Sequence, residues 1–423
     1  MENNLLKKFT TNAFWIMVGR IFQIVLTFIT TMLVTRYLGP TQYGQITLAF
    51  SYVALFIPVG ALGLNDIIVK ELLDKKTDNN SIIGTTIILR LISSSFSIIV
   101  IYFVVKLMSN NPILPYLAVL QGISLIFRVF ECITYFYQSK LLSKKVGIIN
   151  VIAYSLTSIF RIVCLIIKKD IYWFAFAVSL DFIVIAILLI FVYLKDGNKI
   201  VYSKEYVSRL LNKSRPYLFS GIMTVISGKA DTILLGKFID ETTVGYYTSA
   251  TTLCNAWPFV LTAIIDSASP IIIDLYSKDI YLYKKRLRQL YASIFYIGLA
   301  VGLVFTIFSK LIISIAFGSA FLPASNSLKI VCWNTIFSYF GVARFIWMQC
   351  EDKYNYERII TFFGAIFNLI LNFILINKLG IIGASITLVL TQFFMNFVLL
   401  FAIKETREDA RLILDAIMLK DIK

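Results

Sequence analysis

Residues 171–194 read IYWFAFAVSLDFIVIAILLIFVYL, and this stretch decides the fold class. An α-helix rises 1.5 Å per residue, so about 20 apolar residues cross the ~30 Å hydrocarbon core of a bilayer. Asp181 carries the one charge within the stretch. Similar apolar runs, separated by short polar breaks, recur along the whole chain. The sequence therefore predicts an all-α integral membrane protein.

The apolar runs predict about twelve transmembrane helices. They lie near 12–34, 45–65, 82–105, 113–136, 147–167, 171–194, 216–236, 245–271, 290–309, 324–348, 359–377 and 381–403. We expect two pseudo-symmetric six-helix bundles. The predicted parts are an N-terminal bundle over 1–200, a cytoplasmic linker over 201–215, a C-terminal bundle over 216–403 and a cytoplasmic tail over 404–423. The tail suits either a short interfacial helix or a solvated segment.

Two short connections suggest an internal duplication. The connection after the first span, Arg36–Gly44, resembles the connection after the seventh, Lys237–Gly245. Each begins with a basic residue and ends in glycine. Because six spans separate them, the two copies would keep the same orientation and be related by an axis along the membrane normal. A chance resemblance between two short turns is the alternative.

Charge and composition narrow the function. The chain is 58% hydrophobic and carries 40 Lys and Arg against 24 Asp and Glu. The basic residues outside the spans concentrate in the two tails and the even-numbered connections, so both termini should be cytoplasmic and nucleic acid is not an expected partner. The absence of histidine excludes imidazole-dependent catalysis. We therefore expect no enzyme activity, no catalytic residue and no metal site.

Polar residues recur at helical spacing in several spans. In the fourth span, Gln121, Ser124, Arg128 and Glu131 step by three or four positions and share one face. Comparable stripes in the first, third and fifth spans contain Arg20 with Gln23, Thr86 with Arg90 and Ser97, and Thr157 with Arg161. An arginine within such a stripe predicts a shared aqueous surface, because a charge facing lipid is costly.

The arginines suggest a phosphate-bearing ligand. Arg20, Arg90 and Arg128 each lie roughly 12 Å from the cytoplasmic end of their helices, and the planar guanidinium matches phosphate oxygens. The predicted substrate-binding residues are Arg20, Arg90, Arg128, Arg161, Gln23 and Lys229. The alternative is that these arginines pair with acids and lock helices together, as Arg128 and Glu131 could do at i, i+3.

Acidic residues within the spans are candidates for ion coupling or gating. Glu131, Asp231 and Asp266 are the residues in question. Each could bind a coupling Na⁺ or H⁺, and an interhelical ion pair is the alternative. We expect no other cofactor.

Five short segments resemble the Wzx-type polysaccharide flippases of the multidrug/oligosaccharidyl-lipid/polysaccharide exporter superfamily. These segments are Gly19-Arg20, Arg36–Gly44, Gly63–Glu71, Asp231–Gly236 and Val244–Tyr247. The resemblance covers essentially the whole chain. It implies two six-helix lobes around a cationic cavity, and it assigns cavity roles to Arg20 and Asp231.

The resemblance also implies a function. The substrate would be undecaprenyl-diphosphate-linked oligosaccharide, moved across the bacterial inner membrane by alternating access for O-antigen (lipopolysaccharide) or capsule assembly. A polysaccharide polymerase and chain-length proteins would be further partners, beside the lipid bilayer. One alternative is a cation-coupled small-molecule exporter of the same superfamily, although a cationic cavity would repel cationic substrates. Another is an integral-membrane polysaccharide polymerase or ligase, although the external connections are short.

Overall fold

The computed structural model describes the backbone of residues 2–74 and 78–420. Within this range the side chains of residues 2–18, 20, 21 and 66 are not described, so the prediction for Arg20 lies outside the described residues. Contacts divide the chain into two compact units, which we call unit 1 (Met1–Lys229) and unit 2 (Ala230–Lys423). The secondary structure of the described residues is helical throughout, as predicted.

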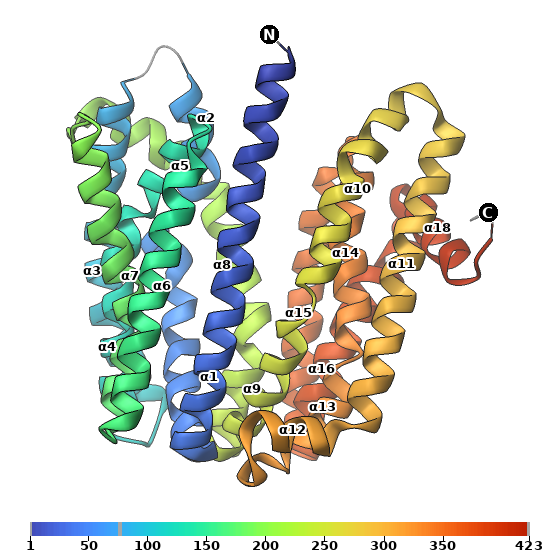
Figure 1. The fold of residues 1–423 in the computed structure, drawn as a ribbon. Helices are drawn as coiled ribbons and strands as arrows, with labels where there is room; N and C mark the ends of the chain where they lie inside the picture. Colours follow the sequence, from blue (N-terminus) through green and yellow to red (C-terminus); the bar gives the residue numbers. More distant parts are fainter. Residues whose placement is uncertain (1, 75–77, 421–423) are drawn as a thin grey trace. The chain divides into compact units, whose positions relative to one another are not determined.

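Unit 1 contains a bundle of long helices and two short ones. They are α1 (Glu2–Ala61), α2 (Asn65–Leu73), α3 (Asn79–Met108), α4 (Leu114–Arg128), the 3₁₀ turn η1 (Val129–Glu131), α5 (Cys132–Ser139), α6 (Ser143–Ile166), α7 (Ile171–Lys195) and the first part of α8 (Lys204–Phe238). Helix α4 packs against α3 and α7, and α6 packs against α1 and α7 (Figure 1). The short helices α2 and α5 pack against each other.

Unit 2 begins within α8 and holds the remaining helices. They are α9 (Glu241–Ala256), α10 (Phe259–Lys278), α11 (Ile280–Ile307), α12 (Ser309–Phe317), η2 (Ser319–Phe321), α13 (Ala324–Val331), α14 (Asn334–Cys350), α15 (Tyr354–Leu379), α16 (Ile381–Phe393), the π-helix η3 (Phe394–Val398), α17 (Leu399–Ala402), η4 (Lys404–Thr406) and α18 (Arg407–Ile417). Helix α10 pairs with α11, and α15 pairs with α16 (Figure 1).

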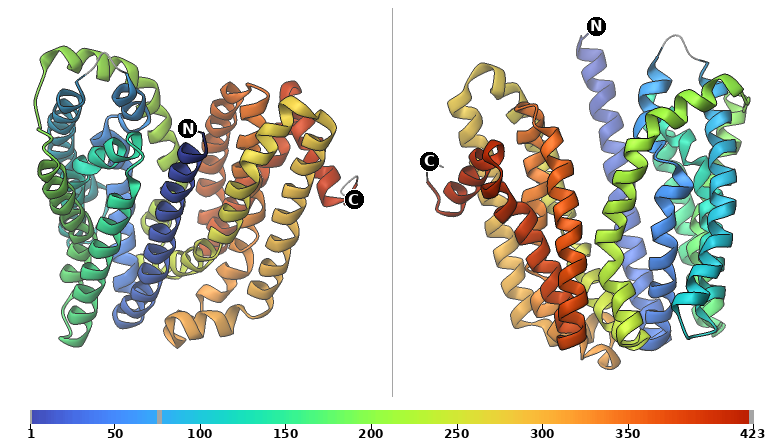
Figure 2. Two further views of the ribbon diagram at one scale, coloured as in Figure 1. Left: turned by 45° about the horizontal axis from the view of Figure 1, so that its top comes forward. Right: turned by 180° about the vertical axis from the view of Figure 1, so that it is seen from behind.

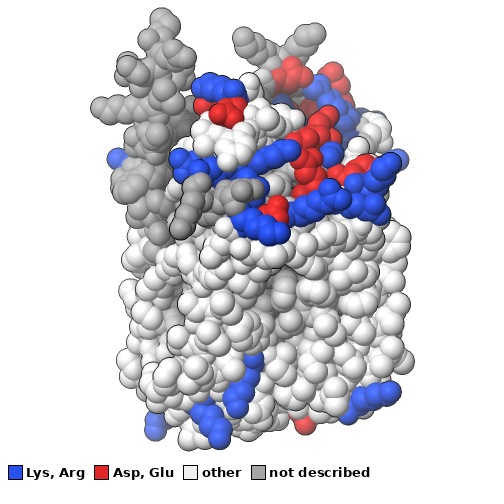
Figure 3. Space-filling view, turned by 90° about the vertical axis from the view of Figure 1, so that its right-hand side faces the viewer, with Lys and Arg blue, Asp and Glu red and all other residues white. Residues whose placement is uncertain are grey.

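The number of membrane-crossing helices agrees with the sequence. Among the described residues, 11 helices are long and apolar enough to span a bilayer. The first, Phe22–Ala61, contains a break at Gly39 and so covers the two expected spans near 12–34 and 45–65. Figure 3 shows an uncharged belt on one face of unit 2, with charged side chains concentrated above it. The chain is therefore a multi-pass membrane protein.

The two connections that suggested a duplication break their helices by different chemistry. In the first, Gly39 adopts a positive φ of 71°, which favours glycine, and Pro40 begins the following helix. In the second, Asp240 has extended backbone angles and its side chain accepts a hydrogen bond from the N–H of Thr243. An aspartate cap of this kind starts a helix without needing glycine.

Helix α8 joins the two units. It begins at Lys204, so most of the predicted linker 201–215 is helical, and the contact division falls later, between Lys229 and Ala230. Figure 2 shows that α8 bends, with its first turns lying across the end of unit 1. Pro216 lies inside the helix. Proline removes one helical hydrogen bond and is a common cause of such a bend.

The C-terminal tail contains an amphipathic helix. Residues Ala410, Leu412, Ile413 and Ala416 of α18 are buried in a core shared with α11. Asp409 of α18 is also fully buried and accepts a hydrogen bond of 2.5 Å from the hydroxyl of Tyr291. Burial raises the pKa of Asp409 to about 7. The predicted tail is thus a docked helix at the edge of unit 2.

Candidate functional site

Arg90 is the most deeply buried of the predicted arginines whose side chains are described. Its side chain projects from α3 and the residue is 3% exposed. Nη1 donates to Oδ1 of Asn65 at 3.1 Å, and Nη2 donates to the backbone carbonyl of Arg128 at 3.1 Å. Both acceptors are neutral, and Nε has no hydrogen-bond partner among the described residues. The positive charge of Arg90 is therefore held in place without a carboxylate bonded to it.

A break in the helical backbone supplies one of these acceptors. Helix α4 ends at Arg128 and the 3₁₀ turn η1 follows. In a regular α-helix the N–H of Cys132 would bond to the carbonyl of Arg128, but here it bonds to the carbonyls of Val129 and Phe130. The Arg128 carbonyl is thus available to Arg90. A 3₁₀ stretch inside a span often marks a functional position.

Arg128 lies beside Arg90 and is more accessible. Its side chain is 24% exposed and its guanidinium stacks over the ring of Phe182, 4.4 Å from the ring centroid. The carboxylate of Glu131 is 3.7 Å from Nε of Arg128, too long for a hydrogen bond. The predicted i, i+3 pair therefore exists as a loose contact, and Arg128 keeps hydrogen-bonding capacity for another anion.

Arg90, Arg128 and Glu131 line one small pocket together with Asn65 and Ser94. Two guanidinium groups and one carboxylate give this pocket an excess of positive charge. Its volume is about 10 Å³, which is enough for a single water molecule. The pocket is closed in this conformation, and a phosphate would enter only after side chains move apart. We call Arg90, Arg128, Glu131 and Asn65 the arginine pocket.

Arg161 has a different environment from Arg90. Its Nη2 contacts Oδ2 of Asp181 at 2.5 Å, and both side chains are nearly buried. A second contact reaches the backbone carbonyl of Ala177 at 3.3 Å. The charge of Arg161 is matched by an adjacent acid.

Several residues of the polar stripes are buried between helices of unit 1. They are Thr86, Ser97, Gln121, Ser124 and Thr157. Gln121, for example, donates from Nε2 to the backbone carbonyl of Ile46 on α1. These residues make contacts between helices, because a polar group buried in a bundle must find a partner there. Arg128 and Glu131, on the same stripe as Gln121, are partly exposed.

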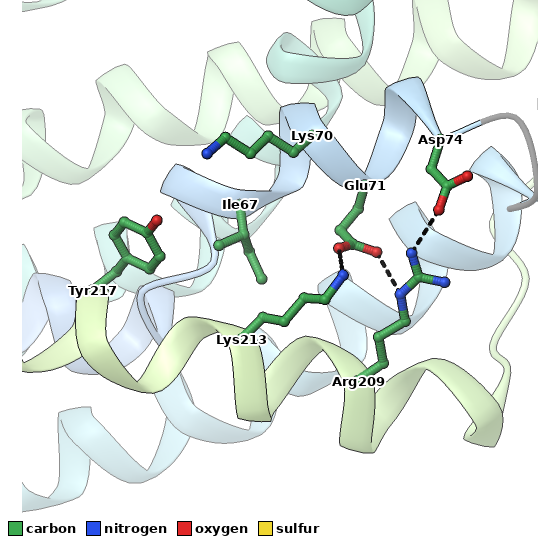
Figure 4. A pocket seen from close by; sticks show the side chains of 7 residues that line it. All are labelled: Ile67, Lys70, Glu71, Asp74, Arg209, Lys213 and Tyr217. Carbon is green, nitrogen blue, oxygen red and sulfur yellow. Dashed lines mark hydrogen bonds and ion pairs between the residues drawn. The ribbon is translucent and has the colours of Figure 1, made fainter. Parts of the chain in front are cut away.

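A larger cavity lies between α2 and α8, both within unit 1. Its volume is about 390 Å³, and its lining includes Ile67, Lys70 and Tyr217 (Figure 4). Beside it, four charged side chains form a network that we call the clasp: Glu71 and Asp74 from α2, and Arg209 and Lys213 from α8.

The clasp is tightly bonded. Glu71 is 4% exposed, forms an ion pair with Nε of Arg209 at 2.7 Å and accepts a hydrogen bond from Nζ of Lys213 at 2.5 Å. Asp74 accepts from Nη2 of Arg209 at 2.8 Å. The clasp was not predicted from the sequence. The two acids are three positions apart and the two bases are four positions apart, so each pair lies on one face of its helix. Only the folded structure shows that the two faces meet.

The remaining predicted residues whose side chains are described are not among the residues that line the arginine pocket. Gln23 is half-buried on α1, and Lys229 lies over the ring of Phe50 at 6.0 Å from its centroid. In unit 2, Asp231 is buried and accepts a hydrogen bond from the hydroxyl of Tyr247. Asp266 is exposed on α10.

Unit 2 also contains buried polar contacts that the sequence analysis left without a role. Arg344 is 1% exposed, with Nη1 bonded to Asn396 at 2.9 Å and Nη2 to Glu357 at 2.8 Å. Asn396 lies in the π-helix η3. A further chain joins Asn372 to Asn368 and Asn368 to Thr391. The i, i+4 spacing of the two asparagines was a signal available in the sequence.

The fold defines a class, namely multi-pass helical membrane proteins. Residues 9–276, more than half of the chain, match the family model described as "Polysaccharide biosynthesis protein". The chain belongs to this family. This family membership agrees with the predicted resemblance to polysaccharide exporters.

Solved structures share the fold at low sequence identity. The lipid II flippase MurJ in an inward closed conformation superposes with a TM-score of 0.70 at 14% identity, covering 95% of this chain and 90% of that one. A multidrug resistance MATE family transporter in an inward-facing conformation gives 0.67 at 15% identity, with 93% and 95% covered. A transporter of the same superfamily from Pyrococcus furiosus gives 0.63 at 14%, with 95% and 96% covered.

A curated relative is the uncharacterized membrane protein MJ1068 of Methanocaldococcus jannaschii. It is 29% identical over 240 residues, which are 52% of this chain and 46% of the relative. The match thus spans about half the length of each protein.

Proposed function

We propose that this protein flips undecaprenyl-diphosphate-linked oligosaccharide across the cytoplasmic membrane by alternating access, for assembly of a surface polysaccharide such as O-antigen or capsule. Both termini would be cytoplasmic, as the distribution of basic residues predicts. The family membership supports a role in polysaccharide biosynthesis. Translocation of a finished lipid-linked unit needs no bond to be made or broken, so no catalytic residue is assigned.

The arginine pocket is the observation that carries this proposal. Arg90 and Arg128 line one pocket in unit 1, and among the residues whose side chains are described Glu131 is the carboxylate that lines it with them. A buried cation bonded only to neutral acceptors is costly unless an anion joins it. A diphosphate offers several oxygens to two guanidinium forks, which is a favoured geometry for arginine.

Entry of the diphosphate would require Glu131 to move. The pocket has room for about one water molecule, and the 3.7 Å contact between Arg128 and Glu131 is its weakest polar link. Displacement of Glu131 would free Arg128 for the phosphate, while Arg90 stays anchored to Asn65. Glu131 would thus occupy the place of the substrate anion when the site is empty and act as a gate.

The other predicted residues have proposed roles in substrate binding, ion coupling or support of the pocket. Arg20 and Gln23 on α1, together with Lys229, would contact the same substrate at other points along its path. Asp231, buried against Tyr247, is the candidate for binding a coupling Na⁺ or H⁺. Asp266 is a second candidate on α10. Arg161 would support the pocket through its pair with Asp181.

The two alternatives make different predictions. An exporter of cationic small molecules would have to overcome repulsion from the arginine pocket. A polymerase or ligase would change the chemical structure of its lipid-linked substrate. Incubation of the purified protein with lipid-linked oligosaccharide distinguishes these cases, because a flippase leaves the chemical structure of the unit unchanged whereas a polymerase or ligase alters it.

A complementation experiment tests the proposal. Arg90→Gln and Arg128→Gln are introduced separately into a strain whose surface glycan depends on this protein, and Arg358→Gln serves as the control because Arg358 is an exposed arginine on α15. We expect each pocket variant to lose most of the surface glycan at normal protein levels, with the control unchanged. Normal glycan in both pocket variants would contradict the proposal.

A further inference from the structure

Helix α2 contacts the arginine pocket at one end and the clasp at the other. Asn65, its first residue, accepts the hydrogen bond from Nη1 of Arg90 at 3.1 Å. Glu71 lies about 9 Å further along the helix, at 1.5 Å per residue. There it is bonded to Arg209 and Lys213 of α8. A helix of this length is stiff, so a displacement at the clasp reaches Asn65.

The two ends of α2 meet α8 by different contacts. At the start of α2, Gly63 packs against the backbone of α8, and Leu64, Ile67 and Leu210 form a small apolar core. At the other end the contacts are ionic, through the clasp, and a cavity of about 390 Å³ lies between the helices. Charge-assisted hydrogen bonds are roughly twice as strong as neutral ones, and loss of both basic partners would leave Glu71 buried without a cation. The clasp therefore fixes the second half of α2 on the first turns of α8.

The guanidinium of Arg90 depends on α2 for its position. Of its two hydrogen bonds, one goes to the side chain of Asn65 and the other to the carbonyl freed at Arg128. A shift of α2 would remove the first bond and allow the guanidinium to rotate within the pocket. Helix α8, which holds the other half of the clasp, is also the helix through which the chain passes from unit 1 into unit 2.

We propose that α2 couples α8 to the arginine pocket, with Asn65 as a positioning residue for Arg90 and the clasp as the control point. Movement of the first turns of α8 opens or closes the clasp, and α2 carries this change to Arg90. This inference rests on the proposed function, because it takes the arginine pocket as the site that binds phosphate.

Binding of inorganic pyrophosphate to the purified full-length protein tests the coupling. Isothermal titration is carried out on the wild type, Asn65→Ala, Glu71→Gln and the double variant Asn65→Ala/Glu71→Gln. We expect each single change to weaken binding by about fivefold or more, within the usual range of coupling between sites. Because both changes act through one route, the double variant should bind no more weakly than the weaker single variant.

Control and conservative variants separate coupling from general damage. Glu205→Gln removes an exposed acid in the first turn of α8 and should leave pyrophosphate affinity unchanged. The conservative variant Glu71→Asp keeps a carboxylate facing Arg209 and Lys213 and should retain most of the affinity. If Glu71→Gln fails to fold, Lys213→Gln replaces it, since Lys213 is half exposed and Arg209 still contacts Glu71.

The outcomes distinguish this inference from the proposed function. Additive losses in the double variant, or unchanged affinity in Glu71→Gln, would overturn the coupling while leaving the pocket assignment intact. No pyrophosphate binding by the wild type would overturn the pocket assignment, and the coupling with it.

Discussion

Arg90 donates a hydrogen bond of 3.1 Å to the backbone carbonyl of Arg128, so two arginines that would repel each other are held side by side. The bond exists because the helix breaks after Arg128 and frees that carbonyl. Two positive charges that line one small pocket repel each other unless an anion offsets them. Glu131 does so weakly at 3.7 Å from Arg128. The arrangement suits a site that binds a second anion.

Removal of the charge on Glu131 should strengthen anion binding. Glu131→Gln keeps the shape of the side chain but removes the carboxylate that faces Arg128. A loose ion pair of this kind is worth up to about 1 kcal/mol, so pyrophosphate affinity should rise roughly two- to fivefold. The gain should shrink at high salt, which screens partly exposed charges. Titration at two salt concentrations measures it, and weaker binding by Glu131→Gln would refute the gating role.

The Arg161–Asp181 pair should affect stability more than transport. Arg161→Met leaves the nearly buried Asp181 without a cation, which costs about 3 kcal/mol for a buried pair. Thermal unfolding in detergent should therefore begin at a lower temperature. The double variant Arg161→Met/Asp181→Leu removes both charges and should recover most of the stability and of the surface glycan. Loss of glycan in a stable double variant would instead indicate direct contact of Arg161 with substrate.

Gly63 should tolerate no side chain. It has a positive φ of 64°, and a Cβ atom there would lie 2.5 Å from the backbone nitrogen of Leu218 on α8. The left-handed conformation alone costs an alanine about 1–2 kcal/mol, and the clash adds to this. Gly197→Ala is the matched control, because Gly197 also has a positive φ but open space around it. Gly63→Ala should lower the temperature of thermal unfolding more than Gly197→Ala does. Equal decreases in the two variants would contradict the close packing of Gly63 against α8.

Docking of α18 should depend on pH through Asp409. Its pKa is raised from 3.8 to about 7 because burial disfavours the charged form, with the hydroxyl of Tyr291 as its bonded partner. Arg344, Glu357 and Glu408 are the other charged groups that act on it. The docked form of α18 binds the Asp409 proton more tightly than the undocked form does. Protonation of Asp409 therefore stabilises docking fully below about pH 4, and this stabilisation is lost as the pH rises through 7.

Hydrogen exchange of α18 at pH 6 and pH 8 measures this dependence. Protection of the helix should be greater at pH 6 in the wild type. Asp409→Asn removes the titrating group and should make protection nearly independent of pH. Equal protection of the wild type at both values would show that Asp409 does not control docking.

The sequence was sufficient for the number and position of the spans. Apolar runs such as 171–194 are long enough to specify a bilayer-crossing helix without knowledge of their neighbours. The i, i+3 contact of Arg128 with Glu131 was also predictable, because both residues lie on one helix. The Gly39 and Asp240 breaks follow from local backbone chemistry as well.

Contacts between distant segments could not be obtained in this way. The polar stripe through Gln121 has the same spacing whether it faces water or another helix, and the structure places it against α1. The tight pairing of Arg161 with Asp181 also joins different helices. In the clasp, Glu71 contacts Arg209, although the two residues are far apart in the sequence of unit 1. No sequence periodicity relates the two positions. Tertiary packing decided each of these outcomes.

Translocation in reconstituted vesicles tests the central claim most directly. Purified protein is placed in liposomes with undecaprenyl-diphosphate-linked oligosaccharide, and access of an external glycan-modifying enzyme to the headgroup reports its movement between leaflets. We predict transfer by the wild type and by Arg358→Gln, with a loss of most transfer in Arg90→Gln and Arg128→Gln. Transfer by both pocket variants at the wild-type rate would contradict the assignment of this site to the diphosphate.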